Sequence, residues 1–301
     1  ARFSVGRQGV AVAERAYQKA VAFARDRVQS RDVAGSSGPV AIIQHPDVRR
    51  MLMTMRALTE GARALAYVAA AASDAGHHHA DPQVRRENMA FYEFMVPIVK
   101  GWSTEMSLEV ASLGVQVHGG MGFIEETGAA QYYRDARILT IYEGTTAIQA
   151  NDLIGRKTAR DGGTVARAIL RQVRQTEEQL QADGSADLAA IRTALVAGTA
   201  ALDEVIGFVV AGAKADVRAV YAGSVPYLKL AGIVLCGWQM ARAALVARQR
   251  LAEGGGDEAF LKSKIATARF FADHILTQAP GLARSIVAGA DGVLALAEAQ
   301  F

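Results

Sequence analysis

Apolar side chains recur every three or four residues along most of the chain, the spacing that places them on one face of an α-helix. In the first half this pattern predicts long helices over residues 2–29, 42–72 and 82–117, and shorter ones over 127–139 and 146–159. No stretch sustains the two-residue alternation that predicts a strand. Long helices joined by short loops favour an antiparallel bundle. We therefore expect an all-α fold.

Sequence signals at the helix ends refine this pattern. Asp81 before Pro82 places a capping carboxylate ahead of a proline in the first helical turn. Pro97 is expected to kink the third helix, because proline lacks a backbone donor and clashes with the preceding turn. Thr146, with Gln149 three residues later, fits a capping box. The chain is therefore expected to turn sharply just ahead of this last helix.

A glycine pair breaks the helical pattern near the middle of the chain. Asp161-Gly162-Gly163 is the sequence's best candidate for a domain boundary. We expect a helical bundle domain over residues 1–160 and an additional helical domain over residues 164–301. Further helices are predicted over residues 164–182, 186–213, 216–250 with an interruption at Pro226, and 257–278, with a last one near the carboxy terminus.

Composition and charge exclude several classes of function. The 33 basic and 30 acidic residues are interspersed and give a net charge of +3, which is not the focused basic stripe of a nucleic-acid binder. The apolar run over residues 230–240 is too short to span a bilayer, so no membrane span is predicted. Cys236 is the single cysteine, which indicates a reducing compartment and a cytoplasmic protein. His77–His79 lack further ligands at a defined spacing, so we predict a solvated loop and no metal site.

Residues 116–149 read QVHGGMGFIEETGAAQYYRDARILTIYEGTTAIQ and carry the candidate chemistry. The glycine cluster alone fits neither a Walker loop nor the dinucleotide fingerprint, and Glu143 alone would be a solvated loop carboxylate. As an ordered set, the glycine-rich turn, the short helix and the carboxylate in Tyr-Glu-Gly-Thr resemble the signature of flavin-dependent acyl-CoA dehydrogenases. Residues 1–29 likewise resemble the first long helix of that family's carboxy-terminal helical domain.

This resemblance implies a reaction. Glu143 would be the base that removes the proton next to a thioester carbonyl, while FAD accepts a hydride from the adjacent carbon. In the family, the backbone N–H of this glutamate and a flavin ribityl hydroxyl polarise the carbonyl. Gly144 would leave room for the substrate at the turn. Arg2 matches an arginine that supports the catalytic loop, and a surface arginine lying along the helix is an equally weighted alternative.

The resemblance also implies residues that bind FAD. Gln116, Gly119 and Gly120 match the turn that contacts the diphosphate or adenosine part of FAD bound by the neighbouring subunit. Glycines suit this role because they let the backbone approach an anion closely. Arg27 matches an arginine that reaches the FAD phosphate, although the Phe-Gly that usually follows is replaced by Val28-Gln29.

Two further residues match the adenosine end of the cofactor site. Thr145 corresponds to a family residue that contacts this part of FAD. Ala147 stands where many relatives have a glutamine, so that contact is expected either to be absent or to come from Gln149.

The family implies an acyl-CoA substrate, an electron-transfer flavoprotein as electron acceptor, and a homodimer or homotetramer. The second half of the chain resembles the extra helical domain of larger members, including the subgroup that acts on 3-methylthiopropanoyl-CoA. A complete member carries a first helical domain and a β domain ahead of residue 1, so the chain is expected to be a carboxy-terminal portion. An acyl-CoA oxidase and a non-catalytic helical assembly module remain as alternatives.

Overall fold

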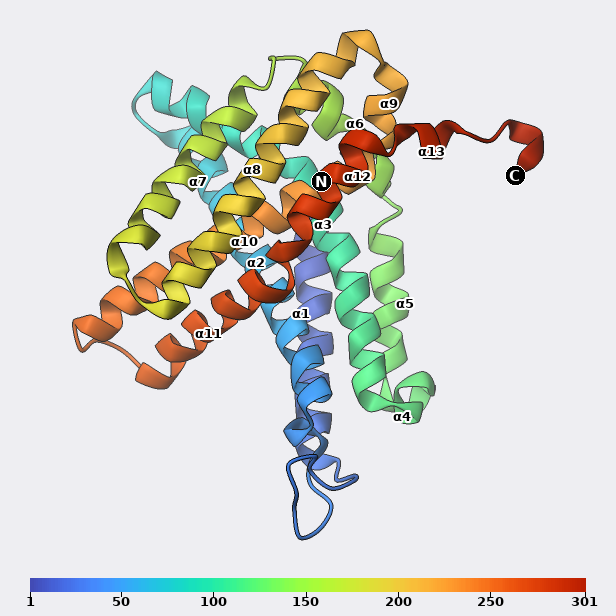
Figure 1. Ribbon diagram of the computed structural model, residues 1–301, viewed down its shortest axis with the longest axis vertical. Coiled ribbons are helices and arrows are strands. Elements are labelled where there is room, and N and C mark those ends of the chain that lie inside the picture. Colours follow the sequence, from blue (N-terminus) through green and yellow to red (C-terminus); the bar gives the residue numbers. More distant parts are fainter.

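The computed structural model describes residues 1–301 and is built from helices, which confirms the all-α prediction. The first half forms an elongated bundle in which α1, α2, α3 and α5 run along its length (Figure 1). The elements of this half are α1 (Arg2–Asp26), η1 (Ile42–Gln44), α2 (Pro46–His78), α3 (Pro82–His118), α4 (Gly120–Phe123), η2 (Glu125–Thr127), α5 (Ala129–Leu139), α6 (Thr146–Asp152) and the π-helical segment η3 (Leu153–Ala159).

The central element of the bundle is α3, which packs between α1 and α2. It runs without a break through Pro97, and Asp81 caps its start by accepting a hydrogen bond from Gln83 N at 2.7 Å. A Cβ on Gly9 would lie 2.6 Å from the Ser103 carbonyl oxygen. The backbones of α1 and α3 therefore approach closely, which fixes the position of the α3 segment beneath the candidate site.

The end of α2 corrects one expectation. His77 and His78 form the last residues of this helix, and His79 is its C-cap residue. The His77 Nδ1 atom lies 2.7 Å from the Ser73 carbonyl oxygen, which is the preceding turn of the helix. The histidine triplet is exposed, as expected, but most of it is helical and not a loop.

The second half of the chain contributes a further set of long helices. The break predicted near Pro226 lies at Gly223, between α9 and α10, and Pro226 falls in the first turn of α10. That position leaves a backbone donor unpaired in any helix, so proline costs little there. The elements are α7 (Thr164–Asp183), α8 (Ala186–Ala215), α9 (Val217–Ala222), α10 (Ser224–Ala252), α11 (Glu258–His274), η4 (Leu276–Gln278), α12 (Ala279–Ala288), α13 (Ala290–Leu294) and η5 (Glu298–Gln300).

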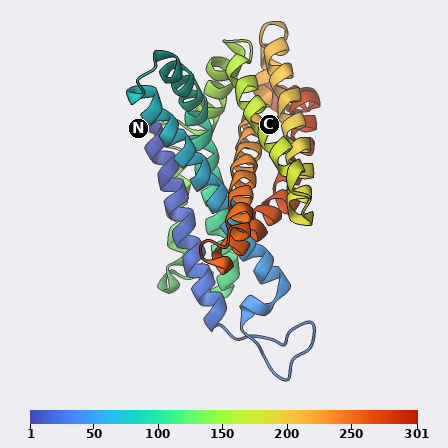
Figure 2. The same cartoon turned by 90° about the vertical axis from the view of Figure 1, so that its left-hand side faces the viewer.

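The two halves lie side by side and share one continuous hydrophobic core (Figure 2). Helix α10 packs against α2, α3 and α6 of the first half. Tyr227 of α10 is buried, and its hydroxyl lies 2.9 Å from the Thr158 hydroxyl. At the predicted boundary, Asp161 Oδ1 accepts a hydrogen bond from Gly163 N at 3.0 Å. The glycine pair is thus part of an ordered turn, and the division into two domains stays a prediction.

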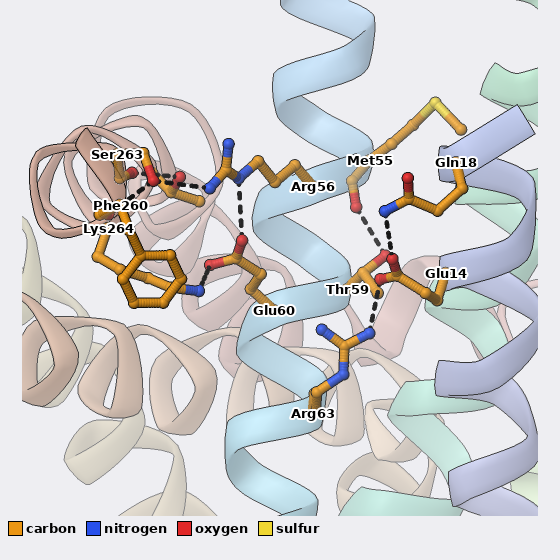
Figure 3. Close-up of polar contacts among 11 residues, drawn as sticks. Glu14, Gln18, Met55, Arg56, Thr59, Glu60, Arg63, Phe260, Ser263 and Lys264 are labelled. Atoms are coloured by element: carbon orange, nitrogen blue, oxygen red, sulfur yellow. Dashed lines mark hydrogen bonds and ion pairs between the residues drawn. The ribbon is translucent and has the colours of Figure 1, made fainter. Parts of the chain in front are cut away.

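Helix α2 makes polar contacts on two sides, and one of them connects the halves (Figure 3). On one side, Glu60 accepts a hydrogen bond from Arg56 at 2.9 Å and one from Lys264 of α11 at 2.7 Å. On the other side, Arg63 donates to Glu14 of α1 at 2.6 Å. Helix α2 therefore lies between the first helix of the chain and a helix of the second half.

Two helices, α8 and α10, are long and apolar enough by length and composition to cross a bilayer. In α10, 78% of the apolar window is buried inside the fold, and in α8 the share is 44%. The hydrophobic core accounts for the apolar character of α10 in particular.

Candidate functional site

The residues predicted to carry chemistry lie in two groups at opposite ends of α1 (Figure 1). Arg2 begins this helix and Arg27 follows its last residue. A rise of 1.5 Å per residue separates them by about 37 Å. The first group, at the start of α1, is Arg2, Glu143, Gly144, Thr145 and Gln149. The second group, near the turn after α3, is Arg27, Gln116, Gly119 and Gly120.

The loop between α5 and α6, which we call the Glu143 loop, spans residues 140–145. Glu143 has a φ of 53° and Gly144 a φ of 91°. Left-handed backbone is uncommon for a residue with a side chain and costs of order 1–3 kcal/mol, so it persists only where the surroundings hold it. The Glu143 side chain is exposed, and its backbone N–H has no partner within the chain. The loop thus combines an exposed glutamate with a backbone amide that is free of any partner within the chain.

Lys100 of α3 holds this loop from beneath. Its side chain is fully buried, and Nζ donates to the Leu139 carbonyl at 2.9 Å and to the Gly144 carbonyl at 2.7 Å. Burial lowers the pKa of Lys100 below its usual value, and the negative charges of Glu105 and Glu143 oppose this shift. One buried nitrogen therefore connects the end of α5 to the residue that follows Glu143.

Gln149 holds the same carbonyl from the α6 side. Its Nε2 donates to the Gly144 carbonyl at 3.1 Å, and its Oε1 accepts from Arg2 at 3.3 Å. Arg2 also forms an ion pair with Asp152 at 2.6 Å. The φ of residue 144 favours glycine, and a Cβ there would also lie 2.6 Å from the Gln149 amide nitrogen and displace it from the Gly144 carbonyl.

This arrangement changes the interpretation of Arg2 and Gln149. The Gln149 side chain has no exposed surface and supports the loop, and its contact with FAD stays a prediction. Arg2 donates to Gln149 and Asp152 and makes no hydrogen bond to Glu143 itself. Both residues belong to the machinery that fixes the loop.

The start of α6 corrects the predicted capping box. Thr145, and not Thr146, is the N-cap residue, and its Oγ1 accepts a hydrogen bond from Ile148 N at 3.4 Å. The Thr146 hydroxyl instead donates to the Glu105 carboxylate of α3. The cap therefore lies one residue earlier than predicted, and the Thr146 hydroxyl contacts α3 instead. Thr145 itself is exposed.

A cavity of about 410 Å³ lies at the other end of α1. Every residue of the second group lines it. Gly119 ends α3 with a φ of 60°, and a Cβ on Gly119 or Gly120 would meet no atom within 4 Å. The lining residues are Phe23, Arg27, Gln29, Ile42, Gln116, Val117, His118, Gly119, Gly120 and Met121. This hollow has the donors that suit an anion: an arginine, glutamine amides and exposed glycine backbone.

His118 forms one wall of this cavity and is held by the fold. It is buried, its ring stacks on Phe23 at 4.3 Å, and its Nδ1 lies 2.7 Å from the Gly114 carbonyl oxygen. Burial lowers the pKa of His118, and the charge of Lys19 adds to this effect, whereas the bond to Gly114 opposes it. These contacts indicate that His118 has a structural role in the wall of the cavity.

Sequence reasoning missed Lys100. The sequence did contain a signal for a buried lysine: in FMVPIVKGWSTEM, mostly apolar and small residues surround Lys100 on all sides of the helix. A lysine on a helix that is buried all round needs partners within the protein. Periodicity cannot say which partners, because both carbonyl groups lie about forty residues further along the chain.

Comparison with known proteins identifies the family. Residues 1–157 match the family model described as "Acyl-CoA dehydrogenase, C-terminal domain", and residues 169–297 match "Acetyl-CoA dehydrogenase C-terminal like". The chain is 55% identical to 3-methylmercaptopropionyl-CoA dehydrogenase of Ruegeria pomeroyi, over 92% of this chain and 47% of that protein. The chain belongs to the acyl-CoA dehydrogenase family.

Other members of the acyl-CoA dehydrogenase family agree with this assignment. The broad-specificity linear acyl-CoA dehydrogenase FadE5 of Mycobacterium tuberculosis is 35% identical over 92% of this chain and 47% of its own length. An acyl-CoA dehydrogenase of Bacillus anthracis, solved with FAD, has the same fold at a TM-score of 0.72, with 20% identity over 97% of this chain and 49% of its own. The chain spans about half the length of the curated relatives it matches.

Proposed function

We propose that this chain is the carboxy-terminal portion of an FAD-dependent acyl-CoA dehydrogenase that converts an acyl-CoA thioester into a 2,3-enoyl-CoA. Glu143 is the base that takes the proton from the carbon next to the thioester carbonyl. FAD, when bound, accepts the hydride from the adjacent carbon. Family membership supports this proposal, and the shape of the Glu143 loop carries it.

The decisive observation is that the loop holds Glu143 in a conformation that a glutamate adopts only under constraint. The left-handed backbone is fixed by Lys100 and Gln149, both bound to the Gly144 carbonyl. The carboxylate projects from this support into the open, where it can reach a substrate proton. The free backbone N–H of Glu143 is a donor suited to a thioester carbonyl whose oxygen gains charge in the transition state.

The residues of the glycine turn fit the cofactor that the proposal requires. Gly119 and Gly120 leave the cavity open where a side chain would fill it. Arg27 and Gln116 line the same cavity and offer charged and neutral donors, which match the diphosphate of FAD. Arg27 would bind a phosphate oxygen, and Gln116 would contact the diphosphate or adenosine portion.

The distance between the two groups supports a homodimer or homotetramer. About 37 Å along α1 separates Arg2 from Arg27, so one chain would present its glycine turn and its Glu143 loop to different cofactors. Each complete site would then take its base from one subunit and part of its FAD contacts from another. A family-typical oligomer provides this arrangement.

The remaining partners follow from the proposed reaction. The 3-methylmercaptopropionyl-CoA dehydrogenase of Ruegeria pomeroyi supports a substrate of the acyl-CoA class for this chain. We propose an electron-transfer flavoprotein as the acceptor that reoxidises the flavin, in the cytoplasm. An acyl-CoA oxidase would instead pass the electrons to dioxygen.

Anaerobic mixing of the full-length FAD-loaded protein with acyl-CoA thioesters tests the proposal. Both 3-methylmercaptopropionyl-CoA and butyryl-CoA should be included. We expect at least one to bleach the flavin absorbance, with formation of a 2,3-enoyl-CoA. A flavin that stays oxidised with every acyl-CoA would reject the function. Rapid reoxidation by dioxygen with stoichiometric hydrogen peroxide would replace the dehydrogenase by an oxidase.

A further inference from the structure

Lys100 is a charged group that the proposed reaction does not use directly. It has no exposed surface, and no carboxylate lies within ion-pair distance of Nζ. A buried ammonium group is unfavourable unless its donors are satisfied. Here two backbone carbonyls satisfy it, at 2.9 Å and 2.7 Å. The fold therefore places a costly charge beneath one particular loop.

The two carbonyls lie on either side of Glu143. Leu139 is the last residue of α5, and Gly144 directly follows Glu143. Between them the chain turns, and the backbone becomes left-handed at Glu143 and Gly144. Lys100 therefore joins the two sides of the turn across its base, and the direction of the Gly144 carbonyl is fixed by a bond that comes from the core.

A second element of α3 holds the same loop. Glu105, on α3 five positions after Lys100, accepts a hydrogen bond from Thr146, the first residue of α6. Side chains of α3 thus form hydrogen bonds with Gly144 in the loop and with Leu139 and Thr146, which flank it. Because α3 is the central helix of the bundle and contributes to the hydrophobic core, these hydrogen bonds connect the loop to the core of the fold.

We infer that Lys100 is a positioning residue for Glu143: its buried ammonium group holds the Glu143 loop in the left-handed shape that aims the carboxylate and the backbone N–H of Glu143 at the substrate. This inference rests on the proposed function for its catalytic consequence, but the positioning itself is a property of the chain. Lys100 touches neither substrate nor cofactor and acts only through the loop.

The test is Lys100→Met in the full-length FAD-loaded protein. Methionine keeps much of the side-chain volume but donates no hydrogen bond, so both carbonyls lose their partner. Lys264→Met is the matched control, because Lys264 is a partly buried lysine that pairs with Glu60 far from the loop (Figure 3). Lys100→Gln is the second variant, because glutamine removes the charge but keeps a hydrogen-bond donor on a slightly shorter side chain.

Two readouts separate positioning from chemistry. Hydrogen–deuterium exchange of peptides that cover residues 139–146 reports the loop without any reaction. We expect faster exchange there in Lys100→Met, with the rest of α3 and α5 unchanged. Anaerobic flavin reduction should slow by about 10²-fold, the size of effect that an ångström-scale misplacement produces, with FAD content and acyl-CoA affinity within about threefold of wild type.

Each outcome decides the inference. A folded Lys100→Met or Lys100→Gln protein that exchanges and reduces its flavin like the Lys264→Met control overturns it. If both Lys100 variants lose FAD and unfold, Lys100 is a core residue required for folding and the positioning role is rejected. A further outcome is that the flavin of the wild-type protein stays oxidised with every acyl-CoA while the loop peptides still exchange faster in Lys100→Met. In that case the proposed function has failed and the positioning role stands.

Discussion

The two ends of α1 differ in how the fold treats the residues placed there. At the Glu143 loop, Lys100, Gln149 and Glu105 are engaged in hydrogen bonds that come from the core of the bundle. At the glycine turn, Arg27 is exposed, and its weak contact with Gln29, at 3.5 Å, is made within its own segment. Hydrogen bonds within the chain fix the Glu143 loop, whereas the glycine turn borders an open cavity.

This difference matches two kinds of task. A base must lie within hydrogen-bond reach of the proton it removes, so its loop has to keep one geometry before the substrate arrives. A phosphate-binding turn can obtain its final order from the ligand, because the anion brings the charge that its donors lack. Under the proposed function, the fixed loop therefore suits the catalytic base, and the open hollow suits the FAD phosphates.

The largest effect should come from Glu143→Gln in the full-length protein. Glutamine keeps the size of the side chain and cannot accept the substrate proton, so we expect flavin reduction to slow by about 10²- to 10⁴-fold. FAD content and acyl-CoA binding should remain near wild type. Anaerobic stopped-flow spectroscopy measures this step. Reduction within a few fold of wild type would assign the base to another carboxylate.

Arg27→Ala should weaken FAD binding by about 10- to 100-fold, the range expected for loss of a hydrogen bond to a charged group. Arg31→Ala is the matched control, since Arg31 is exposed in the same segment and does not line the cavity. Equilibrium dialysis of the full-length protein measures the affinity. Equal affinities in the two variants would remove Arg27 from the FAD site.

Two alanine substitutions in the glycine turn should separate folding from cofactor binding. A Cβ on Gly122 would lie 2.9 Å from the His118 side chain and would clash with the Val115 carbonyl, so Gly122→Ala should destabilise folding by about 1–3 kcal/mol. A Cβ on Gly120 meets open space, so Gly120→Ala should leave unfolding nearly unchanged and weaken FAD retention alone.

Urea unfolding together with FAD content measures both effects of these substitutions. If Gly120→Ala retains FAD like wild type at unchanged stability, the open hollow is not where the cofactor binds. If it unfolds as readily as Gly122→Ala, the space around Gly120 is not open in solution.

The smallest effect concerns the ion pair between α1 and α2. Burial raises the pKa of Glu14, but hydrogen bonds from Arg63 and Gln18 outweigh it and leave the pKa below the usual 4.5. The pair therefore stabilises the fold above pH 4.5, and this contribution is lost as the pH falls through the lowered value. Because both side chains are partly exposed, the effect stays below about 1 kcal/mol.

Urea unfolding of the chain at pH 7 and in acid, for wild type and Glu14→Gln, measures this contribution. The two proteins should differ slightly at neutral pH and converge in acid. If the difference in unfolding free energy between the two proteins is larger in acid than at pH 7, the ionised Glu14 does not stabilise the fold.

Much of the fold was predictable from local pattern, and part of the site was not. Helical spacing located most of the long helices to within a few residues, because burial of an apolar stripe determines them, whereas α2 ends six residues later than predicted. Thr146 was mistaken for the cap, since its contact with Glu105 depends on how α3 lies in the bundle. The support from Lys100 was invisible for the same reason, as its acceptors are backbone carbonyls without a sequence signature.

The distance between the two groups of site residues was also hidden in the sequence. Glu143 and Gly119 are 24 positions apart, but the helix between them, α5, runs back along the bundle and carries the loop away from the turn (Figure 1). The resemblance implied that the turn serves the FAD of a neighbouring subunit, and the three-dimensional arrangement adds the separation of about 37 Å along α1 that agrees with this proposal.

The central claim is that the two ends have separate tasks, and the rate of flavin reduction per bound FAD tests it most directly. It should be measured anaerobically, with saturating acyl-CoA, in full-length Glu143→Gln and Arg27→Ala. We predict that Glu143→Gln retains FAD and reduces it at least 10²-fold more slowly than wild type. Arg27→Ala should contain less FAD, but the bound fraction should react within a few fold of wild type. Equal loss of rate per bound FAD in both variants would contradict the account.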